Sequence, residues 1–345
     1  ILSIIGTYSF NLICISIFAA PALFFLKKSK KEIIACGFFI SVFFSFFIFG
    51  YIKSNEFNSL ENIKNSYTIR AISSDISLDR FYSNEDELKI INELIELSAP
   101  EKKMPIIFLW PEGIIPESYL KDMGTYKNLF LDNFGNDDII IMGLNSRQNK
   151  NDKNLFFNSM AVFNNELNLI KSYNKVNLVP FGEFIPFEKV LSLVGFKTIT
   201  NEYQSFTRGE TRIPLTINNS KINLRFLPLI CYEIIYSGKL SKDKNFDYIF
   251  NISEDGWFGK SVGPKQHFAH SIFRAIESGK YIIRSANNGI SAIINPIGII
   301  EKKIKFGSTG YIDFSESRQI KPTIFLLFGN KFFLILILLY IFLIF

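Results

Sequence analysis

The stretch LPLICYEIIY, residues 227–236, ends a strongly apolar run with a cysteine, Cys231, followed directly by tyrosine and glutamate. The run has the length and composition of a buried β-strand, so the thiol is expected where that strand ends. The chain has three cysteines, and Cys14 and Cys36 lie in apolar segments near the N-terminus. No disulfide is therefore expected in the long polar middle of the chain, and Cys231 requires either deep burial or a chemical use.

Two long apolar segments stand at the N-terminus. Residues 1–26 carry no charged side chain, and a second apolar run covers residues 33–52. Each is long enough to cross a hydrocarbon layer about 30 Å thick. The first run lacks the basic start of a signal peptide, so we interpret both as transmembrane helices within residues 1–53. The basic stretch KKSKKE between them is expected in the cytoplasm, which places the chain after Ile52 on the outer side.

The C-terminal segment, residues 323–345, ends in 14 uninterrupted apolar residues and is interpreted as a returning transmembrane anchor. The chain opens inside an apolar run and without a methionine, which suggests that a further N-terminal portion exists. The net charge is +6, but lysines are dispersed among acidic residues and no nucleic-acid-binding motif occurs. Nucleic acid is therefore not an expected partner.

Between the apolar ends, residues 66–320 alternate short β-rich runs with amphipathic helices, which predicts an α/β domain. Residues 54–65 are polar and are predicted to be a linker. Helices are predicted over residues 84–98 and 265–280. The predicted strands begin at Tyr67, Met104, Asp138, Asn158, Ile222, Asp247, Tyr281 and Ile290.

Three segments of this region carry side chains of complementary chemistry. Glu112 follows the strand and turn of FLWP, and Lys175 lies in the motif YNK, eight residues before Glu183. Taken singly, a surface carboxylate, a solvated lysine and a buried small thiol are the ordinary explanations. Acyl transfer through a thioester needs a nucleophile, a proton shuttle and a positive charge for the oxyanion. Cys231, Glu112 and Lys175 supply these three functions together.

The two histidines are the alternative partners for Cys231. His267 and His270 stand three apart on the predicted helix, where they could face a metal ion together or act as a base. They have no nearby cysteine and no clear carboxylate partner, so a structural role is favoured and no metal or other cofactor is expected. A glutamate is therefore the expected base.

Glutamate, lysine and cysteine in this chain order resemble the triad of the nitrilase superfamily of carbon-nitrogen hydrolases. The flanking motifs WPE, YNK with LVPFGEFIPF, CYE, DGWFG with GPKQHF, and FRAIESGKYIIRSANNGISAIINP resemble the bacterial apolipoprotein N-acyltransferases. The resemblance implies a nitrilase-like α-β-β-α sandwich domain flanked by transmembrane helices. It also implies a multi-pass protein of the bacterial cytoplasmic (inner) membrane, with the catalytic domain on the periplasmic side and several more N-terminal helices than this chain shows.

The resemblance implies a fatty acyl transfer with Glu112, Lys175 and Cys231 as the catalytic residues. Cys231 attacks an ester carbonyl of a membrane phospholipid, Glu112 takes the thiol proton, and Lys175 stabilises the oxyanion. The acyl group then passes from the cysteine thioester to the α-amine of the N-terminal S-diacylglyceryl-cysteine of an apolipoprotein. The implied partners are the phospholipid donor, the diacylated apolipoprotein acceptor and the membrane.

Supporting residues follow from the same resemblance. Glu183 is expected to hold Lys175 charged and oriented, and Glu233 to order the loop behind the nucleophile. A backbone N–H near Tyr232 is expected to assist in binding the oxyanion. Ordinary surface carboxylates remain the alternative for Glu183 and Glu233.

The chain departs from the family pattern at three places. Gly113 stands where a small hydroxyl residue is common, Glu254-Asp255 replaces Asn-Asp, and Ser73 and Asp75 replace Gln and Asn of the first strand. The triad itself is complete, so we expect the chemistry to be intact and the positioning of the substrate to differ.

Some features leave alternatives open. Trp257 and Phe258 are expected either to line an acyl-chain entrance or to pack in the core, and the apolar segment 187–196 either to dip into the membrane interface or to form a buried helix. A membrane-anchored nitrilase-like amidase, which releases the intermediate to water, is the alternative activity. An inactive nitrilase-like binding protein is the alternative from another class.

Overall fold

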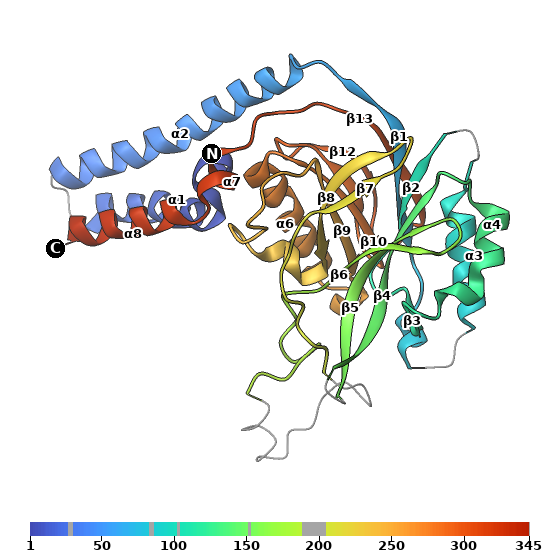
Figure 1. Ribbon diagram of the computed structural model, residues 1–345. Coiled ribbons are helices and arrows are strands. Elements are labelled where there is room, and N and C mark those ends of the chain that lie inside the picture. The colour runs from blue at the N-terminus through green and yellow to red at the C-terminus, as the bar shows by residue number, and fades with distance from the viewer. Residues whose placement is uncertain (27–29, 83–85, 102–103, 151–152, 188–204, 345) are drawn as a thin grey trace.

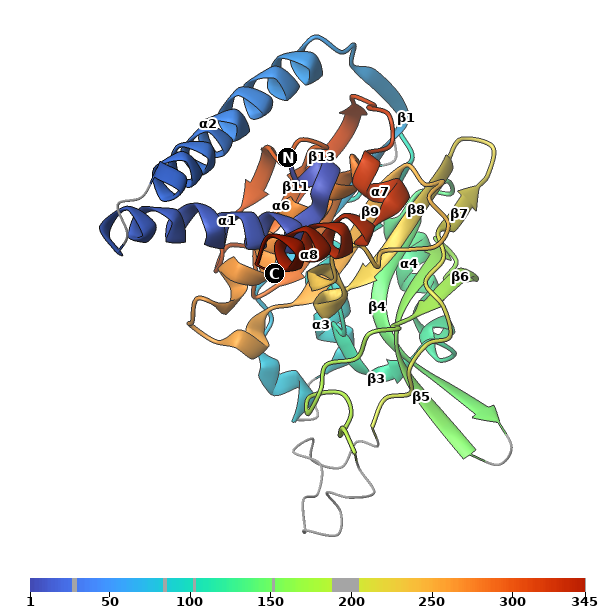
Figure 2. The ribbon, with the colours of Figure 1, turned by 90° about the vertical axis from the view of Figure 1, so that its left-hand side faces the viewer.

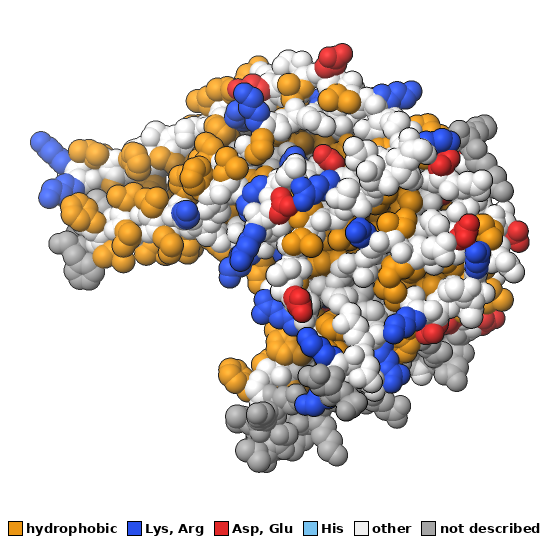
Figure 3. All heavy atoms as spheres, viewed as in Figure 1, with side chains coloured by type: hydrophobic (Ala, Val, Ile, Leu, Met, Phe, Trp, Pro, Cys, Tyr) orange, Lys and Arg blue, Asp and Glu red, His pale blue; other side chains and the backbone are white. Residues whose placement is uncertain are grey.

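The computed structural model describes residues 1–26, 30–82, 86–101, 104–150, 153–187 and 205–344. Helices α1 (Leu2–Leu26), α2 (Lys30–Asn58) and α8 (Lys331–Ile344) project from a sheet-containing domain (Figure 1). By length and composition, α1 and α2 could each cross a membrane, whereas α8 is a shorter apolar helix. Hydrophobic side chains cover much of this projection on the face shown in Figure 3, as expected for surfaces that meet lipid or further helices.

Helices α1 and α8 lie side by side (Figure 2) although they stand at opposite ends of the chain. The rings of Tyr8 and Phe333 are 5.8 Å apart, and the hydroxyls of Ser16 and Tyr340 are 2.5 Å apart. The C-terminal segment therefore returns along the first helix, in the direction that a returning anchor would take.

The connection from helix to sheet is shorter than the predicted linker of residues 54–65. Helix α2 continues to Asn58, and strand β1 (Ile63–Ser74) already begins at Ile63. The prediction was wrong over most of this segment because polar residues can also extend a helix. Lys53 and Glu56, which pair at 2.6 Å, stabilise its last turns.

Thirteen strands of the described chain form one sheet with the main order β6-β5-β4-β2-β1-β10-β9-β8-β7. The strands from β4 to β8 in this order run parallel. Besides β1, the strands are β2 (Ile106–Leu109), β3 (Ile115–Tyr119), β4 (Ile139–Lys150), β5 (Lys153–Asn164), β6 (Leu169–Asn174), β7 (Leu215–Asn218), β8 (Asn223–Ile230), β9 (Tyr248–Glu254), β10 (Tyr281–Asn287), β11 (Ser291–Ile294), β12 (Ile300–Ile304) and β13 (Gly310–Ser317).

Three apolar clusters show how the sheet folds into layers. One cluster joins inward-facing side chains of both halves of the sheet, such as Ile107 of β2 and Phe250 of β9. A second covers the outer face of β1, β2 and β4 with helices α3 (Glu87–Ser98) and α4 (Lys127–Asn133). The third covers the outer face of β8 to β10 with α6 (Gly263–Ser278). The order of layers is thus helix, sheet, sheet, helix, and the predicted nitrilase-like α/β fold is confirmed.

Each predicted strand and both predicted helices are present, with their ends shifted by a few residues. The sequence did not reveal β3, β6, β7, β12 and β13. Strands β6 and β12 are mostly exposed along their length, so they lack the continuous apolar run that marks a buried strand. Pairing with a neighbouring strand, rather than burial of their own side chains, defines them.

Helix α1 joins the domain through a buried polar cluster at a kink. Gly6 has φ of 74°, and a Cβ there would lie 2.0 Å from the ring of Phe325 in α7 (Ile324–Phe328). The backbone N–H and the hydroxyl of the next residue, Thr7, both donate to Glu277 Oε1 at 2.7 Å. Arg274 pairs with Glu277 at 2.7 Å and donates to the Thr7 hydroxyl at 2.6 Å. This ion pair therefore fixes where the projecting helices leave the domain.

The substitution Glu277→Ala should destabilise the protein by about 3–5 kcal/mol, because it leaves the fully buried guanidinium of Arg274 without its carboxylate. Thermal unfolding of the whole chain in detergent measures the loss. Glu93→Ala, on the exposed face of helix α3, is the matched control and should change stability by less than about 0.5 kcal/mol. Equal unfolding temperatures for the two variants would contradict the structural role of this ion pair.

Candidate active site

The predicted catalytic residues gather at one edge of the sheet, where its parallel strands end. Glu112 follows β2, Lys175 follows β6, and Cys231 follows β8. The carboxyl ends of parallel strands share an edge, which is where open α/β sheets bind ligands. Glu112 and Cys231, which are 119 positions apart in the chain, are thereby brought close enough for the charge of one to act on the other.

Glu112 is a buried carboxylate with every oxygen occupied by a donor. Its Oε1 accepts hydrogen bonds from Lys175 Nζ at 2.9 Å and from the side-chain amide of Asn158 at 2.8 Å. Its Oε2 accepts from the backbone N–H of Glu254 at 2.9 Å. Burial alone would raise the pKa of the Glu112 carboxyl, but the charge of Lys175 and these hydrogen bonds hold it below its usual range. Glu112 is therefore ionised and able to accept a proton.

Lys175 is 1% exposed and is shared between two carboxylates. Its Nζ lies 2.9 Å from Glu183 Oε1 as well as 2.9 Å from Glu112 Oε1, so the expected contact between Glu183 and Lys175 is present. Burial lowers the pKa of the Lys175 ammonium, but the two carboxylates outweigh burial and raise the pKa well above its usual value. Lys175 therefore stays charged, which suits a group that binds an oxyanion and excludes a free amine acting as base.

Cys231 occupies a strained position at the start of the short helix η4 (Cys231–Ile235). Its backbone φ is 45°, a left-handed conformation that is unfavourable for a residue with a Cβ. Burial and the charge of Glu112 raise the pKa of the Cys231 thiol well above its usual value, and Lys175 opposes them in part. The thiol is therefore neutral in the resting protein and must lose its proton as it reacts.

Glu233 ties the strand that precedes Cys231 to the loop that carries Lys175. Its Oε2 accepts from the N–H of Ile230 at 2.9 Å, and its Oε1 accepts from the N–H of Val176 at 2.8 Å and of Asn177 at 3.0 Å. Arg212 donates to the same oxygen at 2.5 Å and neutralises the buried charge. The alternative of an ordinary surface carboxylate is wrong, because Glu233 is fully buried. Its contacts match the expected ordering of the loop behind Cys231.

Tyr232 is partly exposed, and its ring lies edge-on to that of Tyr236 with the centroids 5.4 Å apart. Its place directly after Cys231 keeps its backbone close to the thiol. The role of a backbone N–H here in binding the oxyanion stays a prediction.

The structure adds residues that sequence reasoning missed. Asn158 of β5 bridges Glu112 and Glu183, donating at 2.8 Å to each. Asp255 and Arg284 form a buried ion pair at 2.8 Å, and His267 contacts both Asp255 and the carbonyl of Cys231. Asn158 lies in a strand without any motif around it, so no sequence signal distinguishes it. The expectation that His267 has no carboxylate partner was wrong, because its Nδ1 lies 2.8 Å from Asp255 Oδ1.

The departures from the family pattern have structural explanations at two positions. Glu254 is buried and pairs with Arg80 at 2.5 Å, so the charge that it adds is offset. Its backbone N–H donates a hydrogen bond to Glu112. Gly113 has φ of 53°, which glycine adopts without strain. Ser73 is buried, and its hydroxyl donates to the carbonyl of Ser308 at 3.2 Å. Nothing in the structure explains Asp75.

Trp257 and Phe258 are 54% and 41% exposed, so of the two alternatives for these residues, packing in the core does not hold. Their rings lie against Phe81 and His267, with centroids 5.1 and 5.5 Å apart, and leave one face open to the surroundings. The apolar segment 187–196 lies outside the described residues except for Phe187, which is exposed.

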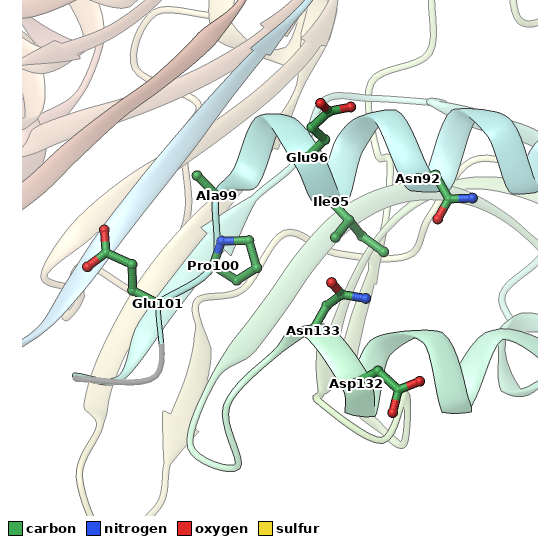
Figure 4. A pocket seen from close by; sticks show the side chains of 8 residues that line it. All are labelled: Asn92, Ile95, Glu96, Ala99, Pro100, Glu101, Asp132 and Asn133. Atoms are coloured by element: carbon green, nitrogen blue, oxygen red, sulfur yellow. The ribbon is translucent and has the colours of Figure 1, made fainter.

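A shallow depression elsewhere on the domain has no part in this site. It lies between the ends of α3 and α4 and is lined by Asn92, Ile95, Glu96, Ala99, Pro100, Glu101, Asp132 and Asn133 (Figure 4). Residues 99–101 precede β2, whereas Glu112 follows it, so the depression is at the opposite edge of the sheet. In the described parts of the chain, no group of three or more His, Cys, Asp and Glu side chains is arranged to hold a metal ion.

The fold and the buried Glu-Lys-Cys grouping define a member of a known enzyme family. The family model for carbon-nitrogen hydrolases matches residues 81–318, and the chain belongs to this family. Among solved structures, the glutamine-dependent NAD+ synthetase from Acinetobacter baumannii superposes with a TM-score of 0.52 at 16% identity, covering 76% of this chain and 48% of that one. This likeness supports the fold alone.

Curated relatives narrow the comparison. The chain is 30% identical over 318 residues to an apolipoprotein N-acyltransferase of Agrobacterium fabrum, covering 90% of this chain and 58% of the relative. It is 30% identical over 346 residues to one of Caulobacter vibrioides, covering 97% of this chain and 64% of the relative. The resemblance inferred from the motifs is confirmed, and the chain spans 58 to 64% of the length of these two relatives.

Gly143→Ala should displace Glu112 and destabilise the protein by about 1–3 kcal/mol. A Cβ at Gly143 would lie 2.5 Å from the Cα of Glu112 and 2.7 Å from the next backbone nitrogen, and neither atom can move freely. Chemical unfolding in detergent measures the loss. Gly124→Ala is the control, since a Cβ there meets nothing within 4 Å, and an equal effect of both substitutions would contradict the close packing.

The rate at which iodoacetamide alkylates Cys231 should still rise with pH above pH 9. The pKa of the thiol is raised well above its usual value, so the thiol is still mostly neutral at pH 9. Glu183→Gln should shift the midpoint of this pH–rate curve to lower pH, since it removes a negative charge that disfavours the thiolate. Lys175→Met should shift the midpoint to higher pH, since it removes the positive charge that favours the thiolate. Cys14 and Cys36 are replaced by alanine beforehand, so that one thiol is observed. A plateau already reached at neutral pH would show a preformed thiolate instead.

Proposed function

We propose that the chain belongs to a membrane N-acyltransferase that moves a fatty acyl group from a phospholipid, through a thioester on Cys231, to the α-amine of a diacylated apolipoprotein. The observation that carries the proposal is the buried ammonium of Lys175 held between Glu112 and Glu183 beside the thiol. The names of the curated relatives support the choice of substrates. Glu112, Lys175 and Cys231 are the proposed catalytic residues, with Glu183, Tyr232 and Glu233 in support.

In the first half of the reaction, the sulfur of Cys231 attacks the ester carbonyl carbon of the phospholipid. The thiol proton passes to Glu112 as the S–C bond forms, because the neutral thiol cannot attack well and the carboxylate is ionised. Lys175 stabilises the negative charge on the carbonyl oxygen. The C–O bond then breaks, and Glu112 returns the proton to the departing alkoxide, which leaves a lysophospholipid and an acyl thioester.

In the second half, the amine of the lipoprotein attacks the thioester carbonyl, with Lys175 again facing the oxyanion. Glu112 accepts a proton from the amine as the N–C bond forms. The C–S bond breaks, the thiolate leaves, and the proton on Glu112 restores the Cys231 thiol. A thioester suits this step because a thiolate leaves more readily toward an amine than an alkoxide does.

A membrane setting is proposed from the projecting helices. The exposed apolar surfaces of α1, α2 and α8 suit a bilayer or further helices, and both substrates carry lipid chains. We place the protein in the bacterial inner membrane as a multi-pass protein, with the catalytic domain on the periplasmic side. The exposed rings of Trp257 and Phe258 favour their assignment to an acyl-chain entrance.

A nitrilase-like amidase is the second candidate, because the same three side chains could pass the intermediate to water. The two activities differ in what discharges the thioester. The exposed apolar helices favour a lipid-linked acceptor over a soluble amide.

Incubation of the detergent-solubilised chain with phosphatidylethanolamine should add one acyl mass to Cys231, seen by intact-protein mass spectrometry. Hydroxylamine should remove the adduct because it is a thioester. Cys231→Ala should abolish it, while Cys36→Ala, a cysteine in helix α2, should leave it unchanged. A diacylated lipopeptide should then discharge the adduct with formation of an amide.

Lys175→Met should slow adduct formation by about 10²–10³-fold, as expected for loss of one oxyanion donor. The exposed Lys171, four residues earlier on β6, provides the matched control Lys171→Met, which should retain the wild-type rate. Discharge by water as fast as by the lipopeptide would favour the amidase. Absence of any adduct on the wild-type chain would leave an inactive binding protein as the better account.

A further inference from the structure

A second buried polar group lies directly behind the nucleophile and takes no part in the chemistry described above. It consists of Asp255 at the end of β9, His267 in α6 and Arg284 in β10, each less than 5% exposed. One Arg284 nitrogen lies 2.9 and 2.8 Å from the two oxygens of Asp255. Asp255 is further confined by Gly289, where a Cβ would lie 2.4 Å from its Oδ2. The group is therefore rigidly built.

His267 spans the distance between this group and Cys231. Its Nδ1 lies 2.8 Å from Asp255 Oδ1, and its Nε2 lies 3.0 Å from the backbone carbonyl oxygen of Cys231. A carbonyl oxygen can only accept a hydrogen bond. Burial would raise the pKa of the Asp255 carboxyl, but Arg284 and His267 outweigh burial and lower it to about 2, so this partner also only accepts.

The Nε2 of His267 must therefore carry a proton and donate to the carbonyl oxygen of Cys231. The Nδ1 of the same ring lies 2.8 Å from Asp255 Oδ1 and 3.3 Å from a side-chain nitrogen of Arg284. These two charged side chains therefore hold the ring from the side opposite to Cys231.

We propose that His267 is a positioning residue for the nucleophile, and that its Nε2–H holds the carbonyl oxygen of Cys231 so that the cysteine keeps its left-handed backbone. A residue with a Cβ adopts φ of 45° at a cost, so an external contact must select this conformation. Asp255 and Arg284 in turn fix the orientation of the ring.

The same contact has a consequence for the thiol. Asp255 is one of the carboxylates that disfavour the thiolate of Cys231. Arg284 pairs with Asp255 at 2.8 Å and offsets this negative charge. His267 thus fixes the position of Cys231, while Arg284 offsets the charge of a third carboxylate besides Glu112 and Glu183. The positioning role rests on the proposed function, whereas the contact between Nε2 and the carbonyl of Cys231 does not.

Histidine-selective ¹⁵N labelling tests the protonation without an activity assay, because the chain has two histidines. The signals of His267 should show a proton on Nε2, and His270→Gln assigns the pair. An unprotonated Nε2 on His267 would overturn the proposal. The measurement needs no substitution at position 267, so it stands even if variants there do not fold.

Kinetics test the positioning role. His267→Phe, which has a ring but no donor, should slow thioester formation about 100-fold with the KM for phospholipid unchanged. His267→Gln keeps an N–H donor and should restore the rate to within about tenfold of wild type. His270→Phe, one turn further along α6, is the matched control and should react as wild type does.

The outcomes separate the two proposals. If wild type forms no thioester, the proposed function fails, and the histidine spectrum alone decides whether Nε2 of His267 donates. If wild type reacts and folded His267→Phe reacts equally fast, the positioning role is wrong. Should thermal unfolding show that His267→Phe does not fold, His267→Met is the second donor-free variant and is judged by the same rates.

Discussion

The whole site depends on one buried ammonium shared between two carboxylates. Lys175 lies 2.9 Å from both Glu112 and Glu183, and Asn158 bridges the same two oxygens. Removing three charges from water is costly, and the cost is offset only when every lone pair and proton has a partner. The surrounding backbone must therefore be rigid, which explains why the charged groups follow strand ends and why Gly143 packs directly against Glu112.

The neutral state of the thiol follows from the same charge balance. Two carboxylates and one ammonium leave an excess of negative charge near Cys231, which raises its pKa together with burial. In the proposed mechanism, a cysteine of this kind is unreactive until a substrate is in place and Glu112 can accept the proton. A neutral, buried thiol also resists oxidation better than an exposed thiolate does.

The same side chain, Arg274, contacts both the projecting helices and the short helix that begins at Cys231. Arg274 pairs with Glu277, which holds Thr7 of helix α1, and it also donates to the backbone carbonyls of Ile234 and Ile235 in helix η4. Cys231 begins that same helix η4. A change in the direction of α1 would therefore move Arg274 and, through it, the backbone of helix η4 about one turn from the thiol. The orientation of the projecting helices and the geometry of the site thus depend on the same contacts.

The sequence was sufficient to predict the fold class, eight strands, two helices of the domain and the grouping of Glu112, Lys175 and Cys231, because apolar runs and strand-end motifs are local signals. It also supplied the resemblance that the relatives confirm. It missed exposed strands such as β6 and β12, which pairing alone defines. The contacts of Asn158 and His267 were decided by tertiary structure, since they join side chains far apart in the chain. Whether a side chain is buried, charged or paired depends on neighbours that only the folded sheet brings together.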